Sequence, residues 1–477
     1  MNNTNEATKL YQKVQDRIES LISEGAFKAG QRIPSIRQLS RQMGVSINTV
    51  KEAYERLERR QLVEARPQSG YYVAEARPKT PKPRSFREED IVPAQISVEE
   101  LYRRMMHHHE SEVLTTLSIA KPNPELLPAR KLNRLMYQAG QIMESESISY
   151  LMPPGHRGLR EQIAQRALSA GYSLNPDEIV VTAGCVEAVA LSLLHLCRPG
   201  DVVAIESPVF FNFLQLMESL QLQALEIPMD PKDGMNLDVL EFALDRNTIT
   251  ACLAITNFSN PLGCRMPDSA KERLVRILEK RSIPLIEDDI YSDLCYSDRR
   301  PLAAKSFERD GGVILCSSFS KTLAPGYRVG WVAGGRYRDE LERLKMVTGV
   351  CAPTPPQIAI AKFLEEGSYD RHLRRIRRAY AQNVNAMRQC IGESFPDGTR
   401  VSRPDGGFML WVELPESLDC VELYRRAIRR GISIAPGVLF DISGQFSHHV
   451  RLNAADWNEE IEAAVTVVGR LACELPS

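Results

Sequence analysis

Residues 317–328 read Ser-Ser-Phe-Ser-Lys-Thr-Leu-Ala-Pro-Gly-Tyr-Arg, which places Lys321 among small hydroxyl residues with Arg328 seven positions later. A lysine amine can form a Schiff base with an aldehyde, and hydroxyls and a guanidinium bind a phosphate dianion. Pyridoxal 5'-phosphate (PLP) requires this set of groups. Serine-rich segments with one lysine are also common surface loops, so the flanking sequence has to decide between the two interpretations.

Five short apolar runs predict the sheet on which this stretch lies. They are residues 179–182, 202–205, 251–255, 284–286 and 313–316, and longer helical segments separate them. Short apolar strands that alternate with helices indicate an α/β domain whose mostly parallel sheet is covered on both faces. In such a sheet the functional residues gather at the carboxyl ends of the strands, and Lys321 follows the fifth run.

Groups that suit a phosphorylated ring follow the first and second runs. Gly184 and Cys185 lie in a small-residue turn that opens a helix, where backbone N–H groups can bind phosphate. Phe210 and Phe211 form an aromatic pair at a loop that could stack on a pyridine ring, although core packing is the default for either phenylalanine.

Groups that could tune a pyridine ring follow the third and fourth runs. Asn260 places an amide at a tight turn, and Asp288 and Tyr291 are three residues apart. An ionised carboxylate against the pyridine nitrogen keeps it protonated, and a phenol or amide on the ring oxygen tunes the adjacent groups. Asp289 adjoins Asp288, so only the spacing to Tyr291 assigns the pyridine partner to Asp288.

The amino-terminal segment has the pattern of a helix-turn-helix with a wing. We expect a first helix to end near Ser23, a second to be capped by Ser35 and ended by Gly44, and a third to follow at once over residues 45–58. Two short strands around Gly70 then form a wing. The second helix of such a motif lies in the major groove of DNA. A small helical protein-interaction domain is the alternative.

Charge and composition confine any DNA contact to one end of the chain. The net charge of all 477 residues is -1, whereas residues 1–76 contain twelve Lys/Arg against nine Asp/Glu. Without a long apolar run or a signal-peptide pattern, we expect a cytoplasmic protein. Ten cysteines without a C-x-x-C pair favour reduced thiols, and we interpret the histidine run at 107–109 as a polar turn that binds no metal.

Residues 8–75 resemble the GntR-type winged helix-turn-helix. The motifs are Ile-Pro-Ser-x-Arg-x-Leu at 33–39 and Gly-Val-Ser-x-x-Thr-Val at 44–50. The resemblance implies that Arg37 contacts phosphates and that Gly70 forms the tip of the wing. It also implies a set of residues that face base edges or the DNA backbone, namely Ser46, Asn48, Thr49 and Lys51. Many relatives have arginine where this chain has Ile47.

Residues 113–472 resemble fold type I, aspartate-aminotransferase-like enzymes, through the order and spacing of the groups above. By this resemblance Lys321, Asp288 and Tyr291 are the catalytic residues, and Lys321 forms the internal aldimine. The other cofactor-binding residues that it implies are Asn260 at the ring oxygen, Phe210 on the ring, Gly184, Cys185, Ser318 and Arg328 at the phosphate, and Tyr150 at the phosphate of the partner subunit. Arg451 would bind a substrate carboxylate. Many relatives have a hydroxyl residue in place of Cys185.

Residues 77–84 alternate proline with basic residues, and we interpret 76–112 as an extended linker that lets the two domains move separately. A GntR-like reader, such a linker and an aminotransferase-like body resemble the MocR subfamily of bacterial regulators. The resemblance implies a homodimeric transcription factor, with reader domains swapped across the dimer, that binds operator DNA and senses PLP or an amino compound. The alternative is a working aminotransferase with an accessory DNA-binding domain.

Overall fold

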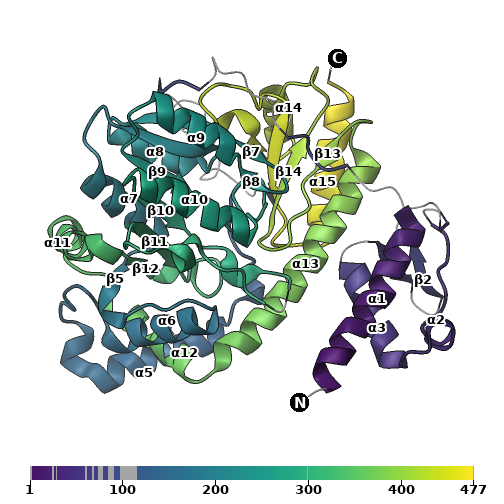
Figure 1. Ribbon diagram of the computed structural model, residues 1–477, viewed down its shortest axis with the longest axis horizontal. Coiled ribbons are helices and arrows are strands. Elements are labelled where there is room, and N and C mark those ends of the chain that lie inside the picture. The colour runs from purple at the N-terminus through teal and green to yellow at the C-terminus, as the bar shows by residue number, and fades with distance from the viewer. Residues whose placement is uncertain are drawn as a thin grey trace. The chain divides into compact units, whose positions relative to one another are not determined.

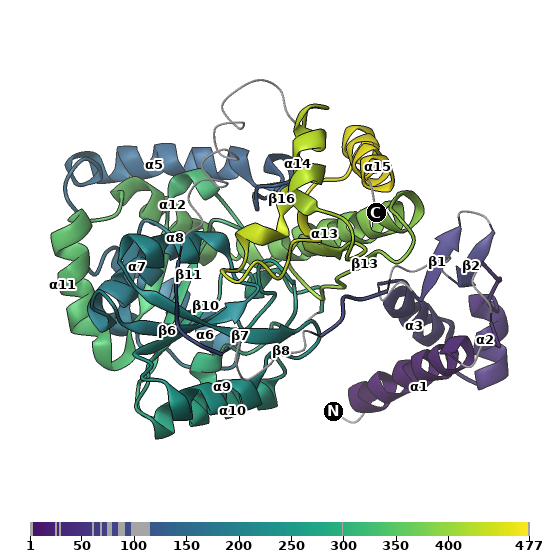
Figure 2. The same ribbon diagram turned by 90° about the horizontal axis from the view of Figure 1, so that it is seen from above.

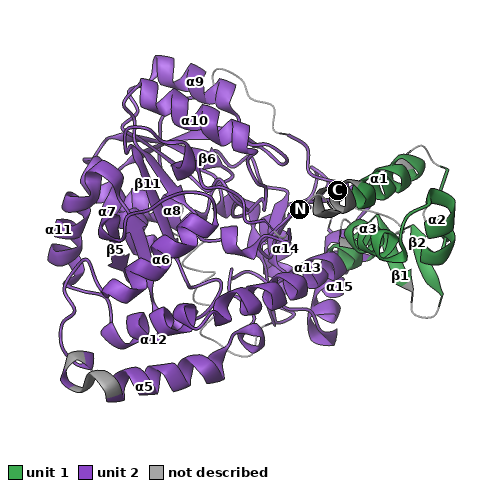
Figure 3. Cartoon of the chain, turned by 60° about the horizontal axis from the view of Figure 1, so that its bottom comes forward, with its two compact units in different colours: residues 1–78, 388–393 green, residues 79–387, 394–477 purple. Residues whose placement is uncertain are grey.

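The computed structural model of the chain describes residues 3–23, 26–27, 30–59, 62–66, 69–73, 79–83, 91–96, 115–297 and 299–475. The chain divides into two compact units, which Figure 3 shows in different colours. Unit 1 comprises Met1–Pro78 and Arg388–Glu393, and unit 2 comprises Lys79–Met387 and Ser394–Ser477. The histidine run at 107–109 and most of the predicted linker lie outside the described residues.

Unit 1 is a small helical unit with a two-stranded sheet (Figure 1). Its elements are α1 (Asn3–Ser23), α2 (Ile36–Met43), α3 (Ile47–Arg59), β1 (Val63–Arg66) and β2 (Gly70–Val73). Ser35 caps α2 by accepting a hydrogen bond from the backbone N–H of Gln38, and Gly44 ends it with a left-handed φ of 63°. Val50, Tyr54 and other apolar residues of one α3 face are buried, so the predicted helix-turn-helix and wing are confirmed.

The main sheet of unit 2 has nine strands within the described residues and is mostly parallel. In spatial order they are β3 (Ala94–Gln95), β7 (Gln223–Asp230), β6 (Val202–Ser207), β9 (Ala251–Ala254), β10 (Leu285–Asp288), β11 (Val313–Ser318), β12 (Gly330–Ala333) and β5 (Ile179–Thr182), with β8 (Gly234–Met235) paired to β7. Five of these strands coincide, within a few residues, with the predicted runs. The antiparallel β12 separates β11 from β5, so the Lys321 loop and the Gly184 turn lie on neighbouring parts of the sheet.

Helices cover both faces of this sheet (Figures 1 and 2). One face packs against α7 (Cys185–Leu196), α8 (Phe211–Ser219) and α11 (Arg338–Gly349), and the other against α6 (Arg157–Ser169), α12 (Thr354–Glu365) and the first turns of α13 (Ser368–Ser394). Successive strand residues alternate between the two cores: Ile314 and Cys316 belong to one, and Leu315 to the other. The helix α5 (Ala129–Ser147) lies along α12, and α9 (Leu237–Arg246) lies beside α10 (Asp268–Lys280).

A smaller antiparallel sheet forms the α+β part of unit 2. Its strands, in order, are β13 (Arg400–Val401), β14 (Met409–Glu413), β17 (His449–Asn453) and β16 (Ala435–Pro436), accompanied by α14 (Cys420–Ile428) and α15 (Glu459–Cys473). The strand β15 (Ile432–Ser433) pairs with β4 (Thr115–Thr116) and brings residues 117–121 beside β17. The predicted fold class, a mostly parallel sheet with a smaller α+β part, is confirmed.

The described parts of the predicted linker are attached to unit 2. The backbone N–H of Lys82 donates to Glu413, and β3 pairs with β7. Ile91 and Ile96 are buried. Proline-rich composition predicted an extended chain in solvent, but buried isoleucines and backbone pairing hold these two pieces against the body, which the composition did not reveal.

Candidate functional site

Lys321 lies in the turn after β11, at the carboxyl edge of the parallel strands. Its Nζ donates a hydrogen bond to the carbonyl oxygen of Ala120 at 2.5 Å and lies 5.9 Å from the centre of the Tyr291 ring. Burial, together with the nearby Arg451, lowers the pKa of Lys321 to about 8. A substantial share of this amine is therefore neutral near pH 8, and the neutral amine is the form that attacks an aldehyde.

The adjacent acids Asp288 and Asp289 point to different partners. Asp289 accepts hydrogen bonds from Asn257 and Ser292 and forms a 2.5 Å ion pair with Arg300, so its carboxylate is occupied. Asp288 accepts from the Cys185 thiol at 3.1 Å, and Lys321 is among the charges that act on it. Of the two acids, Asp288 is the one that shares a site with Lys321.

Burial raises the pKa of Asp288 to about 6, against a smaller lowering by its hydrogen bonds from Cys185 and the backbone of Ile290. Asp288 is therefore mostly ionised at neutral pH and can pair with a protonated ring nitrogen. Burial also raises the pKa of Tyr291, whose phenol stays protonated and able to donate.

Arg451 on β17 is fully buried, and its guanidinium faces this site. Nη1 donates to Asn260 at 3.0 Å and Nη2 donates to the carbonyl oxygen of Ser118, while Nε is buried without a hydrogen-bond partner in the described part of the chain. The rings of Phe211 and Phe440 lie 5.5 Å and 5.0 Å from the guanidinium carbon. Burial lowers the pKa of Arg451 to about 10, so it keeps its charge at neutral pH.

The turn before α7 and the Lys321 loop form a cradle that contains Arg328 and the N-terminus of α7. Gly184, with φ 117°, precedes α7, and a Cβ there would lie 2.3 Å from Nη2 of Arg328. Arg328 also donates to Ser320 at 3.3 Å, and Ser318 accepts from the N–H of Ser320. A glycine at 184 thus lets the guanidinium approach the helix N-terminus, where an anion is favoured.

Three other predicted cofactor-binding residues differ in their contacts and exposure. The thiol of Cys185 donates to Asp288, so only the backbone of this residue is left for a phosphate. Phe210 is partly buried against Phe211 and Phe213, which leaves part of its ring exposed. Tyr150, predicted to reach a partner subunit, is 79% exposed in the single chain.

Several residues of the site were missed from the sequence. The carbonyl oxygens of Ser118 and Ala120 accept hydrogen bonds from Arg451 and Lys321, respectively. Asn453 donates to the carbonyl oxygens of Ile119 and Lys121, which flank Ala120. A contact made by a backbone carbonyl cannot be predicted from the identity of the residue. Ser320, which contacts Arg328, could have been predicted, because it stands beside Lys321 in the same serine-rich stretch.

The site has the charges that PLP and a carboxylate would neutralise. Within the described residues, no ion pair joins Arg328 or Arg451 to a carboxylate, and Lys321 is a third cation. Asp288 is the acid that acts on Lys321. The cradle beside Arg328 fits a phosphate dianion, the unpaired Arg451 Nε fits a carboxylate, and Asp288 fits a pyridinium. The residues present therefore fit PLP.

Most of the predicted DNA-binding residues are accessible on unit 1. Arg37, Ser46, Asn48 and Lys51 are exposed, and Thr49 is partly buried. The hydroxyl of Ser46 accepts the N–H of Thr49 at 3.0 Å and lies 2.8 Å from its hydroxyl, so it caps α3. Gly70, with φ 110°, begins β2 beside Arg32.

Comparisons with known proteins agree with both units. The family model for bacterial regulatory proteins of the gntR family matches residues 10–73, and the model for aminotransferase class I and II matches residues 125–468. The Escherichia coli HTH-type transcriptional regulators YdcR and YjiR are 38% and 37% identical, over 98% and 93% of this chain and 99% and 94% of their own. The chain belongs to the MocR subfamily of GntR-type regulators.

A solved structure supports the same assignment for unit 2 of this MocR protein. LysN, the α-aminoadipate aminotransferase of Thermus thermophilus, was crystallised with N-(5'-phosphopyridoxyl)-L-leucine and matches with a TM-score of 0.73. It is 27% identical, and the match covers 79% of this chain and 95% of LysN. Family membership and the fit of the site make PLP the cofactor of this domain. None of the described helices is long and apolar enough to span a bilayer.

Proposed function

We propose that this MocR protein is a homodimeric, PLP-dependent transcription factor of the cytoplasm that senses PLP or an amino compound at the Lys321 site. The observation that carries this proposal is the fully buried Arg451, whose Nε has no partner in the described residues, in the same site as Lys321. Burying a cation without a partner costs free energy of folding, and binding of an anion offsets this cost. A DNA reader in the same chain gives such a site a regulatory purpose.

PLP supplies an aldehyde for the Lys321 amine and, through its ring, a sink for electrons. The chain's own residues hold and orient it. Asp288 would pair with the ring nitrogen, Tyr291 and Asn260 would bond the ring oxygen, and Phe210 would stack on the ring. The phosphate would be held by the α7 N-terminus with Gly184, the backbone of Cys185, Ser318 and Arg328.

The effector that suits Arg451 is an amino compound that bears a carboxylate. A guanidinium binds a carboxylate through two parallel hydrogen bonds, and the surrounding rings of Phe211 and Phe440 exclude water from that pair. A ligand can shift the arrangement of the reader only if it binds one arrangement better than the other. We therefore propose that the effector acts on the arrangement of the reader domains, which in a swapped dimer would be coupled to both sites.

The dimer is supported by exposed apolar side chains on α5 and just after it. Tyr137, Ile148, Tyr150 and Met152 are 66%, 89%, 79% and 42% exposed. Large apolar groups concentrated in one segment of a soluble chain are typical of a protein interface. In a dimer through this segment, Tyr150 would reach the phosphate bound by the partner subunit.

Aminotransferase activity is the second candidate function. It is favoured by the set Lys321, Asp288, Tyr291, Asn260 and Arg451, which contains every group that transamination requires. Multiple turnovers of an amino acid and a keto acid, at rates typical of enzymes, would establish it as the principal role.

The proposed function is tested with Lys321→Ala in the full-length protein. The variant should lose the visible absorbance of lysine-bound PLP and still retard operator DNA at about 0.1 M salt. Lys362→Ala is the matched control, because Lys362 is an exposed lysine of α12 paired with Glu365. Retention of lysine-bound PLP by Lys321→Ala, or failure of the wild-type protein to retard DNA, would refute the proposal.

A further inference from the structure

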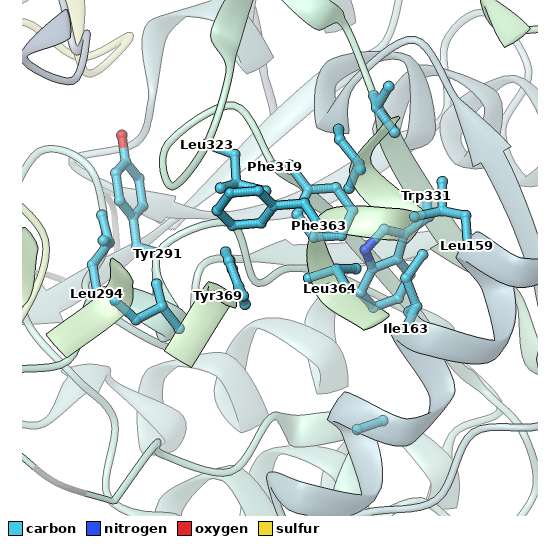
Figure 4. Packing of buried hydrophobic residues seen from close by; sticks show 14 of the residues in the cluster. Leu159, Ile163, Tyr291, Leu294, Phe319, Leu323, Trp331, Phe363, Leu364 and Tyr369 are labelled. Atoms are coloured by element: carbon cyan, nitrogen blue, oxygen red, sulfur yellow. The ribbon is translucent and has the colours of Figure 1, made fainter. Parts of the chain in front are cut away.

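We propose that Tyr369, at the start of α13, is a positioning residue that holds Lys321 through the hydroxyl of Thr322; the proposal rests on the binding of PLP by Lys321. Tyr369 and Thr322 are 2% and 1% exposed, and their hydroxyl oxygens are 2.8 Å apart. Figure 4 shows Tyr369 beside Phe319 and Leu323, which belong to the Lys321 loop. A contact to the residue next to Lys321 restricts the backbone from which the amine projects.

The charge of Asp293 and the single proton of the Tyr369 hydroxyl fix the direction of each hydrogen bond in this contact. The Tyr369 hydroxyl lies 2.9 Å from Oδ2 of Asp293 as well as 2.8 Å from Thr322. An ionised carboxylate only accepts, so the single phenolic proton goes to Asp293. The hydroxyl of Thr322 must then donate to the oxygen of Tyr369. A threonine donor at position 322 is therefore required, and serine could replace it.

Asp293 stays ionised because arginines surround it. Burial alone would raise its pKa, but Arg166, Arg300 and Arg377 outweigh burial and hold the pKa well below its usual range. Arg300 donates to Oδ1 at 2.9 Å and also pairs with Asp289, the neighbour of Asp288. The network thus joins Thr322, the residue after Lys321, to Asp289, the residue after Asp288.

A second hydrogen bond from α13 holds the same residue. Nε2 of His372 lies 2.6 Å from the carbonyl oxygen of Thr322, and because a carbonyl only accepts, His372 donates. Tyr369 and His372 are three residues apart and share one face of the helix. Thr322 is therefore held by its side chain and its backbone from one turn of α13.

The test compares Tyr369→Phe, Thr322→Val and Thr322→Ser in the full-length protein. Loss of one hydrogen bond should weaken PLP binding about five-fold in the first two variants, while Thr322→Ser should match the wild type. A loosened loop exposes the amine, so the pH midpoint for PLP attachment, measured by stopped-flow absorbance, should rise above that of the wild type in the same two variants. A change of stability alone would not move this midpoint.

Tyr380→Phe is the matched control, because Tyr380 is buried on α13 about three turns later and packs on Phe408 instead of the lysine loop. It should leave PLP affinity and the pH midpoint unchanged. Wild-type behaviour of Tyr369→Phe and Thr322→Val would overturn the positioning role and leave PLP binding by Lys321 intact. If the wild type itself bound no PLP through Lys321, the proposed function would fail first.

A separate observation in unit 1 points to a residue that reads thymine. Ile47 is the first residue of α3 and is 52% exposed, although Val50, Tyr54 and Leu57 of the same helix are buried. Its exposed neighbours are Asn48 and Lys51. The first turn of a recognition helix contacts base edges, and the C5-methyl of thymine is the apolar group on the floor of the major groove. We infer that Ile47 contacts this methyl group; this rests on DNA binding by α3.

Deoxyuridine tests the inference because it lacks only that methyl group. Duplexes selected from a random library by the full-length protein would be remade with deoxyuridine at each thymine in turn. Loss of one buried methyl contact should weaken wild-type binding about four-fold at a defined thymine and leave Ile47→Ala unaffected there. Leu10→Ala is the control, since Leu10 on α1 is also an exposed aliphatic residue, at 39%.

Equal sensitivity of the wild type and Ile47→Ala to every deoxyuridine would overturn the role of Ile47. Absence of any selected sequence would instead count against the regulator function. The two failures are therefore distinguishable.

Discussion

At the scale of single residues, burial separates groups whose sequence context is nearly identical. Asp288 and Asp289 are adjacent, yet Asp289 is occupied by Arg300, Asn257 and Ser292, and Asp288 lies beside Cys185 on the Lys321 side. The three-residue spacing to Tyr291 pointed to the same acid, but only the packing gives the physical reason. The side chain of Cys185 could not be predicted in the same way, because the sequence does not reveal that its thiol turns to a carboxylate.

The pKa of Asp288 gives a pH dependence. Its pKa is raised to about 6, so the group takes up a proton as the pH falls through 6 and can then no longer pair with a pyridinium. PLP affinity should therefore fall as the pH drops from 7 to below 6, separately from any change that Lys321 causes near pH 8. Equilibrium titrations from pH 5 to 8 measure this affinity. The Asp288→Asn variant should bind PLP weakly, and its affinity should not change near pH 6. A wild-type affinity that does not change between pH 5 and 7 would contradict the assignment.

Arg451 should determine the affinity for effectors that bear a carboxylate and should not be needed for PLP binding. Arg451→Met should retain lysine-bound PLP and should be at least as stable as the wild type, because it removes a buried cation whose Nε is unpaired. Binding of an α-amino acid should weaken by about 10- to 100-fold, as expected for a lost charged hydrogen bond. The matching amine without a carboxylate should bind both proteins equally in calorimetric titrations. An unchanged amino-acid affinity would remove Arg451 from the effector site.

At the scale of elements, local patterns predicted what local interactions determine. The caps of α2 at Ser35 and Gly44 and the five apolar strands could be read from the sequence, because a cap and a buried strand depend on few neighbours. The antiparallel β12 and the segment at 117–121 were missed, since long-range pairing places them. The anchoring of β3 on β7 was missed for the same reason.

Substitutions of Ser46 test whether its hydroxyl stabilises α3 or contacts a base. As the cap of α3 it should contribute about 1 kcal/mol, so Ser46→Ala should lower the unfolding free energy of the reader by about that amount. Ser46→Asn keeps a capping oxygen and should be close to wild type in thermal unfolding and in selected DNA sequence. A changed sequence preference with unchanged stability would mean that Ser46 reads bases instead.

At the scale of the whole molecule, a cofactor site with unpaired cations and a DNA reader occur in one chain. The exposed apolar residues Tyr137, Ile148 and Tyr150 predict a dimer. Replacing Ile148 and Tyr150 with aspartate should shift the mass measured by light scattering from dimer towards monomer and weaken PLP binding, because Tyr150 would no longer reach the partner's phosphate. Ile442→Asp, at a partly buried position on the body, is a control for general destabilisation. A dimeric double variant would place the interface elsewhere.

Control of DNA binding by the Lys321 site is tested by the affinity of the full-length protein for its selected operator. This affinity is measured by fluorescence anisotropy with and without PLP and then with a panel of amino acids. We predict that PLP or one amino acid changes the affinity of the wild type at least five-fold, a typical allosteric coupling, and leaves Lys321→Ala unchanged. Identical operator affinities of the wild type under all conditions, alongside rapid turnover of amino acids, would contradict control by this site and identify the protein as an aminotransferase.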